Sequence, residues 1–277
     1  MTSDLVELAL PALTDLAITL YLPGLVVPET SHPQAATSYV SDSGDFTGDP
    51  DGAPFRTAMP HWVFVDAVEV LPAGDASAIV ALGDSVTEGT GTTFNTNRRW
   101  PDFRARRLVD ANASRGVLNP GINGNKVLNS LLGDLALLRF DKDVLGQAGV
   151  RYVILLEGIN DIGLGNPDVT AEQIIAGYRA LFRRAHDNGL RIFGGTLTPA
   201  EGNPYSFCEP YAESKRVAVN RFIRETGEFD AVIDFAAAVS DPANPTRWRQ
   251  GFSHDALHPS DAGALALTEA IDLSLFD

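Results

Sequence analysis

Residues 77–89 read "SAIVALGDSVTEG", and the change from apolar to polar letters within this stretch decides the fold. Residues 77–83 form a short, continuous apolar run that ends in glycine, which is typical of a strand buried on both faces of a sheet. Similar runs are "RYVILLEG" at 151–158, "RIFGGTL" at 191–197 and "DAVIDF" at 230–235, with a weaker candidate, "GVLN", at 116–119. The sequence therefore predicts about five strands of a parallel sheet.

The segments between these runs show helical patterns. Pro101 suits the first turn of one helix, and Thr170 with Gln173 forms a capping box at the start of another. In residues 125–140, Val127, Leu131, Leu135 and Leu138 recur at helical spacing. The expected helices cover residues 100–111, 125–140, 170–189, 213–227 and 260–276. Strands that alternate with helices predict an α/β fold, with a parallel sheet sandwiched between helices.

The first 75 residues follow a different pattern. "LAITLYL" at 16–22 alternates, and "HWVFVDAVEV" at 61–70 is rich in aromatic and β-branched residues, so both are predicted to be strands. Two or three strands are too few to bury their own faces. We therefore expect a β-rich N-terminal segment at 1–75 that packs on a partner subunit or on the α/β domain at 76–277.

Composition and charge restrict the function classes. The 277 residues carry a formal net charge of −15, which disfavours binding to nucleic acid or to an anionic membrane. No Lys or Arg precedes Arg56, and the N-terminus lacks the basic start and unbroken apolar run of a secretory signal. The single Cys208 cannot form an internal disulfide and is not expected to be a nucleophile. A cytoplasmic location is the expectation, with secretion as the alternative if a signal has been removed.

Ser85 lies directly after the first buried run, at the sheet edge where ligands of such folds bind. Serine at a strand-to-helix junction is most often a helix cap. A catalytic serine also needs a base, which is usually a histidine held by a carboxylate. Asp255 and His258 lie three residues apart in "FSHDALHPSDAG" at 252–263, so a tight loop or one helical turn places them on the same side. Pro259 disfavours helix at His258, which places this pair in the loop before the last helix.

Residues 252–263 also allow a second interpretation, a metal site. His254 and His258 are spaced i,i+4, and "HDALH" differs from the zinc motif H-E-x-x-H by one methylene group. That motif must lie within a helix to bring both rings to one face, whereas Gly251, Ser253 and Pro259 favour a loop. The expectation is that no metal or other cofactor is needed, with a metallohydrolase as the remote alternative.

Two further loops offer hydrogen-bond donors at the same edge. Gly124 lies in "NPGINGNKV" at 119–127, and Asn160 lies in "LLEGINDIG" at 155–163, just past a buried strand. Each residue alone is typical of a turn. Together with Ser85 and the Asp255–His258 pair, they supply the nucleophile, the base and the oxyanion donors that acyl transfer requires.

These blocks resemble those of the SGNH hydrolases, also called the GDSL esterase/lipase family. The matching residues, in order, are Ser85 in "GDSVTEG", Gly124 in "NPGING", Asn160 in "GIND" and His258 in "DALH". The resemblance spans roughly residues 79–259 and implies a flavodoxin-like αβα sandwich. It also implies a triad of Ser85, His258 and Asp255, with an oxyanion hole formed by the Ser85 N–H, the Gly124 N–H and the Asn160 amide. Asp84 is then expected to brace the nucleophile loop.

The resemblance also carries expectations about partners and substrates. Many relatives look as if they carry a fuller β-sandwich upstream, so unpaired edges here would be covered by a homo-oligomer. The sequence shows no apolar lid for a long acyl chain, which favours a serine esterase acting on acetyl to butyryl esters. Carbohydrate O-deacetylation is the alternative, and a non-catalytic carbohydrate-binding module is a third class. The aromatic residues Phe94, Trp100, Tyr205 and Phe207 are expected either to line the site or to pack in the core.

Overall fold

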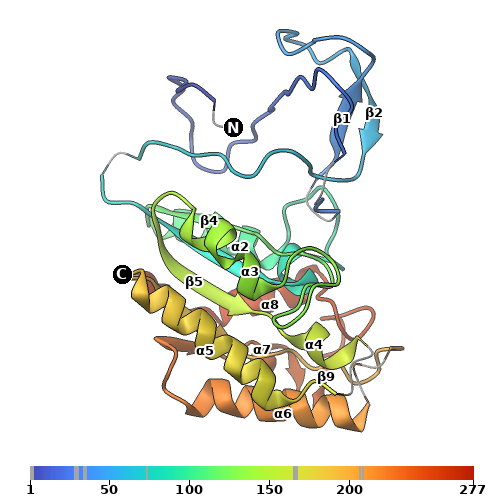
Figure 1. Ribbon diagram of the computed structural model, residues 1–277, viewed down its shortest axis with the longest axis vertical. Coiled ribbons are helices and arrows are strands. Elements are labelled where there is room, and N and C mark those ends of the chain that lie inside the picture. The colour runs from blue at the N-terminus through green and yellow to red at the C-terminus, as the bar shows by residue number, and fades with distance from the viewer. Residues whose placement is uncertain are drawn as a thin grey trace.

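The computed structural model describes residues 3–27, 31–33, 36–72, 74–164, 168–205, 207 and 209–277 (Figure 1). Cys208, for which no catalytic role is expected, lies outside the described residues. Among the described residues, no helix is both long enough and apolar enough to cross a membrane.

A five-stranded parallel sheet forms the centre of the fold, in the order β4-β3-β5-β6-β7. Its strands are β3 (Ser77–Gly83), β4 (Arg115–Leu118), β5 (Val150–Leu156), β6 (Arg191–Gly195) and β7 (Ala231–Ile233). All five expected strands are confirmed, and every residue of β3 is buried, as a strand covered on both faces requires. The strand order reverses between β3 and β5, so the crevice beyond their carboxyl ends is the ligand position of this topology.

Helices flank the sheet and complete a three-layer αβα sandwich. They are α1 (Ser85–Glu88), α2 (Trp100–Asp110), α3 (Ala136–Phe140), α4 (Ile159–Gly163), α5 (Ala171–Asp187), α6 (Pro210–Glu225), α7 (Phe235–Val239) and α8 (Asp261–Glu269). A π-helical turn (Asp141–Leu145) follows α3, a 3₁₀ turn (Leu273–Phe276) follows α8, and a hairpin of β8 (Ser240–Asp241) and β9 (Asn244–Trp248) precedes α8. Helix α2 contacts α8, and α5 contacts α6. The capping box of Thr170 and Gln173 is confirmed.

The helix expected over residues 125–140 is wrong for most of its length, because only α3 and the following π-helical turn are helical. The Asn125 amide donates to the carbonyls of Leu132 (3.0 Å) and Asp134 (2.8 Å). The Asp161 carboxylate accepts from the backbone N–H groups of Val127 (2.8 Å) and Leu128 (3.0 Å). Side chains thus bind backbone groups that a helix would pair internally, and the segment forms a loop.

The N-terminal segment contains a small antiparallel sheet, but not where the sequence pattern places it. The paired strands are β1 (Ser38–Ser41) and β2 (Phe55–Met59), which lie between the two expected strands. The strands expected at 16–22 and 61–70 are wrong: neither belongs to a sheet, and residues 61–70 make one isolated bridge, between Trp62 and His32. Alternation favours extended backbone, but a strand also needs a neighbour to pair with, and local sequence does not supply one.

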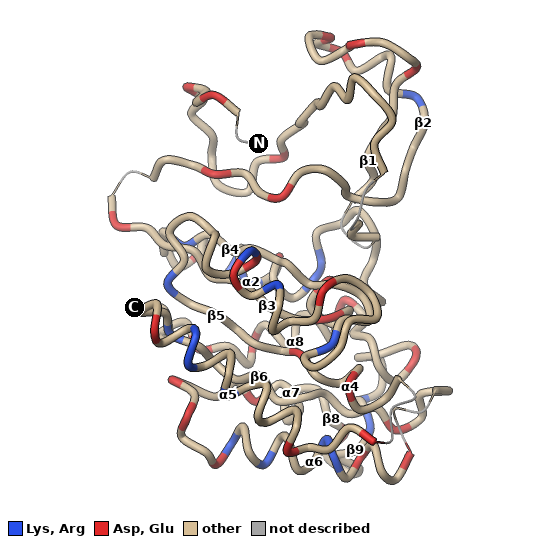
Figure 2. Tube along the Cα trace, in the orientation of Figure 1, with Lys and Arg blue, Asp and Glu red and all other residues tan. Residues whose placement is uncertain are grey.

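The N-terminal segment extends from one end of the molecule, whereas α5 and α6 lie at the other end (Figure 1). Acidic residues recur along it, and the first basic residue in the sequence is Arg56 on β2 (Figure 2). Many of its apolar side chains are exposed, including those of Leu16, Ile18, Leu20 and Leu22. The core of the fold is instead the αβα sandwich, where the side chains of β3 and β5 meet those of the flanking helices.

Candidate active site

Ser85 is the first residue of α1, and only Asp84 separates it from the end of β3. Its neighbour Asp84, not Ser85, caps this short helix, because the Asp84 carboxylate accepts a hydrogen bond from the N–H of Val86 (2.9 Å). The expectation that Asp84 braces the loop agrees with this contact. The Ser85 hydroxyl instead lies 2.9 Å from Nε2 of His258.

His258 and Asp255 come together through a tight loop between β9 and α8. The Asp255 Oδ2 atom lies 2.6 Å from Nδ1 of His258, and Asp255 Oδ1 accepts from the backbone N–H groups of Leu257 (3.0 Å) and His258 (2.8 Å). The backbone of Ala256 takes a positive φ of 60°, which closes the turn. The loop conformation expected from Pro259 is confirmed. Ser85, His258 and Asp255 thus form a continuous hydrogen-bonded chain.

The electrostatics of Asp255 suit a carboxylate that orients a base. Partial burial by itself raises the pKa of Asp255, but hydrogen bonds from the N–H and ring of His258 outweigh it and lower the pKa below its ordinary value. An ionised Asp255 accepts a hydrogen from Nδ1 of His258. Nε2 is then the unprotonated nitrogen, in position to accept a proton from Ser85.

Asn160 and Gly124 meet at the carboxyl ends of β4 and β5. Asn160 lies in the first turn of α4, and its Nδ2 donates to the backbone carbonyl of Asn125 (2.9 Å), the residue after Gly124. This contact uses one of the two amide hydrogens of Asn160. Gly124 has a positive φ of 71°, and a Cβ atom there would lie 2.7 Å from Cδ1 of Leu132. The positive φ therefore favours glycine at this position.

The loop that carries Gly124 also packs directly on the loop that carries Ser85. The N–H of Ile122 donates to the carbonyl of Gly83 (3.1 Å), and a Cβ atom at Gly121 would lie 2.3 Å from the backbone nitrogen of Glu88. The loops of Ser85, Gly124 and Asn160 are thus joined to one another, and His258 reaches the same edge from the loop before α8.

The aromatic residues and the histidine pair singled out from the sequence do not share one location. Trp100 is buried against Phe235, with ring centroids 5.7 Å apart, and Phe207 is buried in a small cluster with Leu257, so both pack in the core. Tyr205 is exposed. Nδ1 of His258 contacts Asp255 and Nε2 contacts Ser85, and the segment with His254 is not helical. Within the described ranges, no three His, Cys, Asp or Glu side chains form a group that could hold a metal ion.

Arg139 is a buried residue beneath the site that the sequence pattern did not indicate, because it lies within an apolar run. Its guanidinium donates to the carbonyls of Gly83 (2.9 Å) and Pro120 (2.6 Å) and to the side chain of Asn125 (2.9 Å). It also pairs with Asp143 (2.9 Å). One cation therefore ties the start of the nucleophile loop to the loop that carries Gly124.

Three carboxyl groups are buried in this region, and Arg139 acts on two of them. Burial raises the pKa of Asp84 to about 7 and that of Asp161 to about 6, and it raises the pKa of Glu157 well above its ordinary value. Arg139 lowers the pKa values of Asp84 and Glu157, but burial dominates at both. The folded protein therefore holds protons here that the unfolded chain releases.

This proton uptake predicts a pH-dependent stability that Asp84→Asn removes in part. The pKa of Asp84 rises from 3.8 to about 7 on folding, so the folded state loses stability as the pH rises from about 4 through 7. An asparagine still accepts from Val86 but carries no charge. Between pH 5 and pH 8, the Tm of the wild type is expected to fall by several degrees relative to the variant. In a chain of this size, a loss of ~1 kcal/mol in the free energy of unfolding lowers the Tm by roughly 2–4 °C.

Differential scanning calorimetry at pH 5, 6.5 and 8 measures this effect. Asp66→Asn serves as the matched control, because Asp66 is exposed and its ion pair with Lys142 spans 3.9 Å at the surface. Parallel curves of Tm against pH for the wild type and Asp84→Asn would contradict the prediction.

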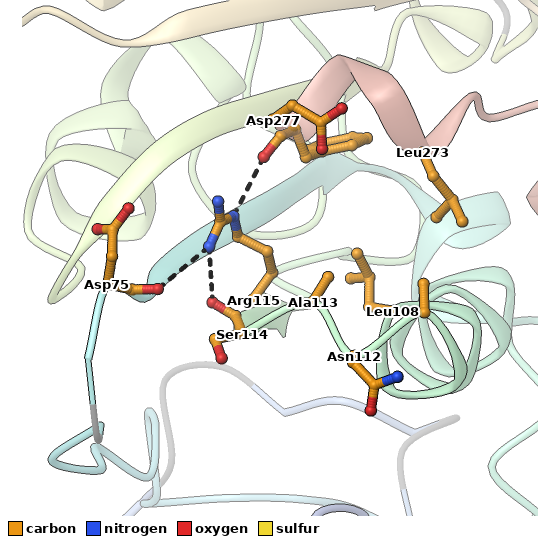
Figure 3. Close-up of a pocket in the computed structure, with 10 residues that line it drawn as sticks. Asp75, Leu108, Asn112, Ala113, Ser114, Arg115, Leu273 and Asp277 are labelled. Carbon is orange, nitrogen blue, oxygen red and sulfur yellow. Dashed lines mark hydrogen bonds between the residues drawn. The ribbon is translucent and has the colours of Figure 1, made fainter.

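A cavity of about 380 Å³ lies at the opposite edge of the sheet, near the starts of β3 and β4 (Figure 3). Arg115 lines it and donates to the carbonyls of Asp75 (3.4 Å), Ser114 (3.0 Å) and Phe276 (3.2 Å). None of the proposed catalytic residues borders this cavity. It is therefore separate from the site at Ser85.

Comparisons with known proteins match the part of the chain that carries these residues. The profile of the GDSL-like Lipase/Acylhydrolase family matches residues 81–266, a range that contains Ser85, Gly124, Asn160, Asp255 and His258. The comparison with curated proteins finds no match.

Solved structures share the fold at low sequence identity. A putative lipolytic protein of the G-D-S-L family from Desulfitobacterium hafniense DCB-2 is 24% identical, with a TM-score of 0.54, covering 70% of this chain and 97% of its own. The M. smegmatis aryl esterase is 15% identical, with a TM-score of 0.58 and coverage of 70% and 95%. A catalytic mutant of Axe2, an acetylxylan esterase from Geobacillus stearothermophilus, is 22% identical, with a TM-score of 0.55 and coverage of 72% and 94%. This chain belongs to the GDSL-like lipase/acylhydrolase family and is a carboxylic ester hydrolase.

Proposed function

We propose that the protein hydrolyses short-chain carboxylic esters through an acyl-enzyme formed on Ser85. The observation that carries this proposal is the contact chain from Ser85 Oγ to His258 Nε2 (2.9 Å) and from His258 Nδ1 to Asp255 Oδ2 (2.6 Å). A serine hydroxyl becomes an effective nucleophile when an oriented imidazole accepts its proton.

The proposed reaction has two halves. Ser85 Oγ attacks the ester carbonyl while His258 Nε2 takes the hydroxyl proton, and the tetrahedral intermediate collapses as His258 returns that proton to the departing alcohol. A water molecule then attacks the acyl-serine with His258 again as the base, which releases the carboxylic acid and restores Ser85. Asp255 stays ionised throughout and stabilises the imidazolium.

The negative oxygen of each tetrahedral intermediate requires donors that are already in place. The proposed donors are the remaining amide hydrogen of Asn160 and the backbone N–H groups of Gly124 and Ser85. The bond between Asn160 and the Asn125 carbonyl (2.9 Å) supports this proposal, because it holds the Asn160 amide beside the residue that follows Gly124.

Asn160→Ala tests the oxyanion assignment. Loss of one such donor is expected to lower kcat by about 10²–10³-fold, or roughly 3 kcal/mol, with little change in KM, because the donor acts on charge that develops in the transition state. Steady-state kinetics on p-nitrophenyl acetate measure it. Asn188→Ala, at the exposed end of α5, is the matched control. A raised KM with unchanged kcat would assign Asn160 to substrate binding instead.

The rim of the site favours a small apolar group on the ester. Leu132 lies against Gly124 and remains 50% exposed, and its neighbour Leu131 is 58% exposed. A short acyl chain or an aryl alcohol would cover these side chains and remove apolar surface from water. Sugar O-acetyl esters are the second candidate, since one structure with this fold is described as an acetylxylan esterase.

The proposal is tested by a series of p-nitrophenyl esters from acetyl to dodecanoyl, alongside acetylated xylooligosaccharides. We expect kcat/KM to be highest from acetyl to butyryl and to fall beyond. A fluorophosphonate probe should label the peptide that contains Ser85. If neither ester class is hydrolysed and Ser85 stays unlabelled, the proposed function is wrong.

Self-association also stays a proposal. Exposed apolar side chains are concentrated in the N-terminal segment, where Leu5, Val6, Leu8 and Leu25 lie in contact with water. A second copy covering this segment would remove that surface from water. A monomeric mass by light scattering would contradict it.

A further inference from the structure

His32 connects the N-terminal segment to the loop that carries Gly124. Its Nδ1 lies 2.9 Å from the carbonyl oxygen of Gly121, 89 residues away in the sequence. The backbone of His32 is itself anchored, because its N–H and carbonyl both pair with Trp62 at 3.1 Å. A carbonyl oxygen can only accept a hydrogen bond, so Nδ1 is the donor.

The peptide group between Gly121 and Ile122 is therefore held at both ends. Its carbonyl accepts from His32, and its N–H, on Ile122, donates to the carbonyl of Gly83 (3.1 Å), two residues before Ser85. The Glu88 carboxylate, at the end of α1, lies 4.0 Å from the same nitrogen of His32. His32 thus lies where the loop of Gly124 meets the helix of Ser85.

A second contact joins the N-terminal segment to the loop that follows α1. The backbone N–H of Thr37 donates to Oδ1 of Asn95 (2.8 Å), and Nδ2 of Asn95 donates to Oγ1 of Thr37 (2.6 Å). Asn95 belongs to the loop after α1, in which Gly91 packs so closely that a Cβ atom there would lie 3.0 Å from Cβ of His258. The segment therefore contacts one loop beside Gly124 and another beside His258.

We propose that the N-terminal segment is part of the catalytic unit and that His32 is a positioning residue for the oxyanion hole. The inference rests on the proposed function, because it assigns His32 the task of fixing the Gly124 loop relative to Ser85. Displacement of a catalytic donor by about 1 Å can lower the rate roughly 10²-fold. Loss of the His32 contact should therefore weaken stabilisation of the transition state more than binding of the ester.

The test compares His32→Ala, His32→Asn and His61→Ala. An asparagine amide at position 32 can supply a donor in place of Nδ1. His61 is the matched control, since it lies in the same segment with its ring near Ser31 (3.3 Å). The readouts are kcat and KM on p-nitrophenyl acetate, the Ki of an alkyl boronic acid that forms a tetrahedral adduct with the serine, and Tm.

We expect His32→Ala to lower kcat about 10- to 100-fold and to weaken boronate binding by a similar factor, with KM changed less than about twofold. His32→Asn should recover most of both losses, and His61→Ala should match the wild type. Unchanged kcat and Ki in His32→Ala would overturn the proposal. The proposal would also be overturned if His61→Ala or His32→Asn lost as much kcat and boronate binding as His32→Ala, because either result would indicate a general packing effect.

Failure of this inference is distinguishable from failure of the proposed function. If the wild type hydrolyses the ester and the fluorophosphonate labels Ser85, the proposed function stands whatever His32→Ala does. If the wild type does neither, both proposals are wrong. If His32→Ala is unfolded by its Tm, the comparison of His32→Asn with His61→Ala decides the matter.

Discussion

Ser85→Ala is expected to lower kcat on p-nitrophenyl acetate by about four orders of magnitude or more, with the fold unchanged. Alanine removes the atom that attacks the ester, and no other hydroxyl group is shown within hydrogen-bond distance of Nε2 of His258 among the described residues. The remaining activity would come from the oxyanion donors and from water. Hydrolysis measured by stopped assay, together with the loss of fluorophosphonate labelling, checks the prediction.

Two controls separate this result from the metal alternative. Ser214→Ala removes a hydroxyl from the exposed part of α6, where Oγ donates to the Tyr211 carbonyl (2.9 Å), and should leave kcat unchanged. His254→Ala and treatment with a chelator should also have little effect on a serine esterase. Full activity in Ser85→Ala, combined with loss in His254→Ala or with chelator, would support the metallohydrolase instead.

Asp255→Asn is expected to lower kcat by about 10³–10⁴-fold. Oδ1 of residue 255 accepts from two backbone N–H groups, those of Leu257 and His258, so an asparagine would keep its oxygen there. Its amide nitrogen would then face Nδ1 of His258 and donate to it. The ring would carry its hydrogen on Nε2, which is the wrong tautomer for accepting a proton from Ser85.

The protein contains a matched control for this substitution. Asp230 lies 3.0 Å from Nε2 of His186 in a second Asp–His pair, far along the chain from Ser85 and Asn160. Asp230→Asn should leave kcat near the wild-type value. If Asp255→Asn retains wild-type kcat, then the carboxylate does not orient the base, and the backbone of the loop alone positions His258.

Local sequence was sufficient for the sheet and for the candidate site. Continuous apolar runs such as residues 77–83 are buried on both faces, and this pattern does not depend on which strands are neighbours. Ser85, Asn160 and the Asp255–His258 pair could be placed together because the carboxyl ends of parallel strands share one edge. Asp84 was expected to brace the loop, and it caps α1.

Local sequence was misleading where distant groups compete for the backbone. Leu131 and Leu135 follow helical spacing, but Asn125 and Asp161 bind backbone groups of that segment and hold it as a loop. Residues 16–22 alternate like a strand but have no paired neighbour in the sheets. The buried Arg139 was not indicated either, because its partners at Gly83 and Pro120 lie far from it in the sequence.

The sequence by itself determined the residue types of the site and the strands that carry them, because burial of apolar runs and the breaks at glycine are local properties. Only the tertiary structure decided the distances on which the proposed reaction depends. These are the 2.9 Å contact between Ser85 and His258, and the contact of His32 with Gly121. These pairs are 173 and 89 residues apart in the chain, and packing of the intervening segments alone brings them within reach of a hydrogen bond.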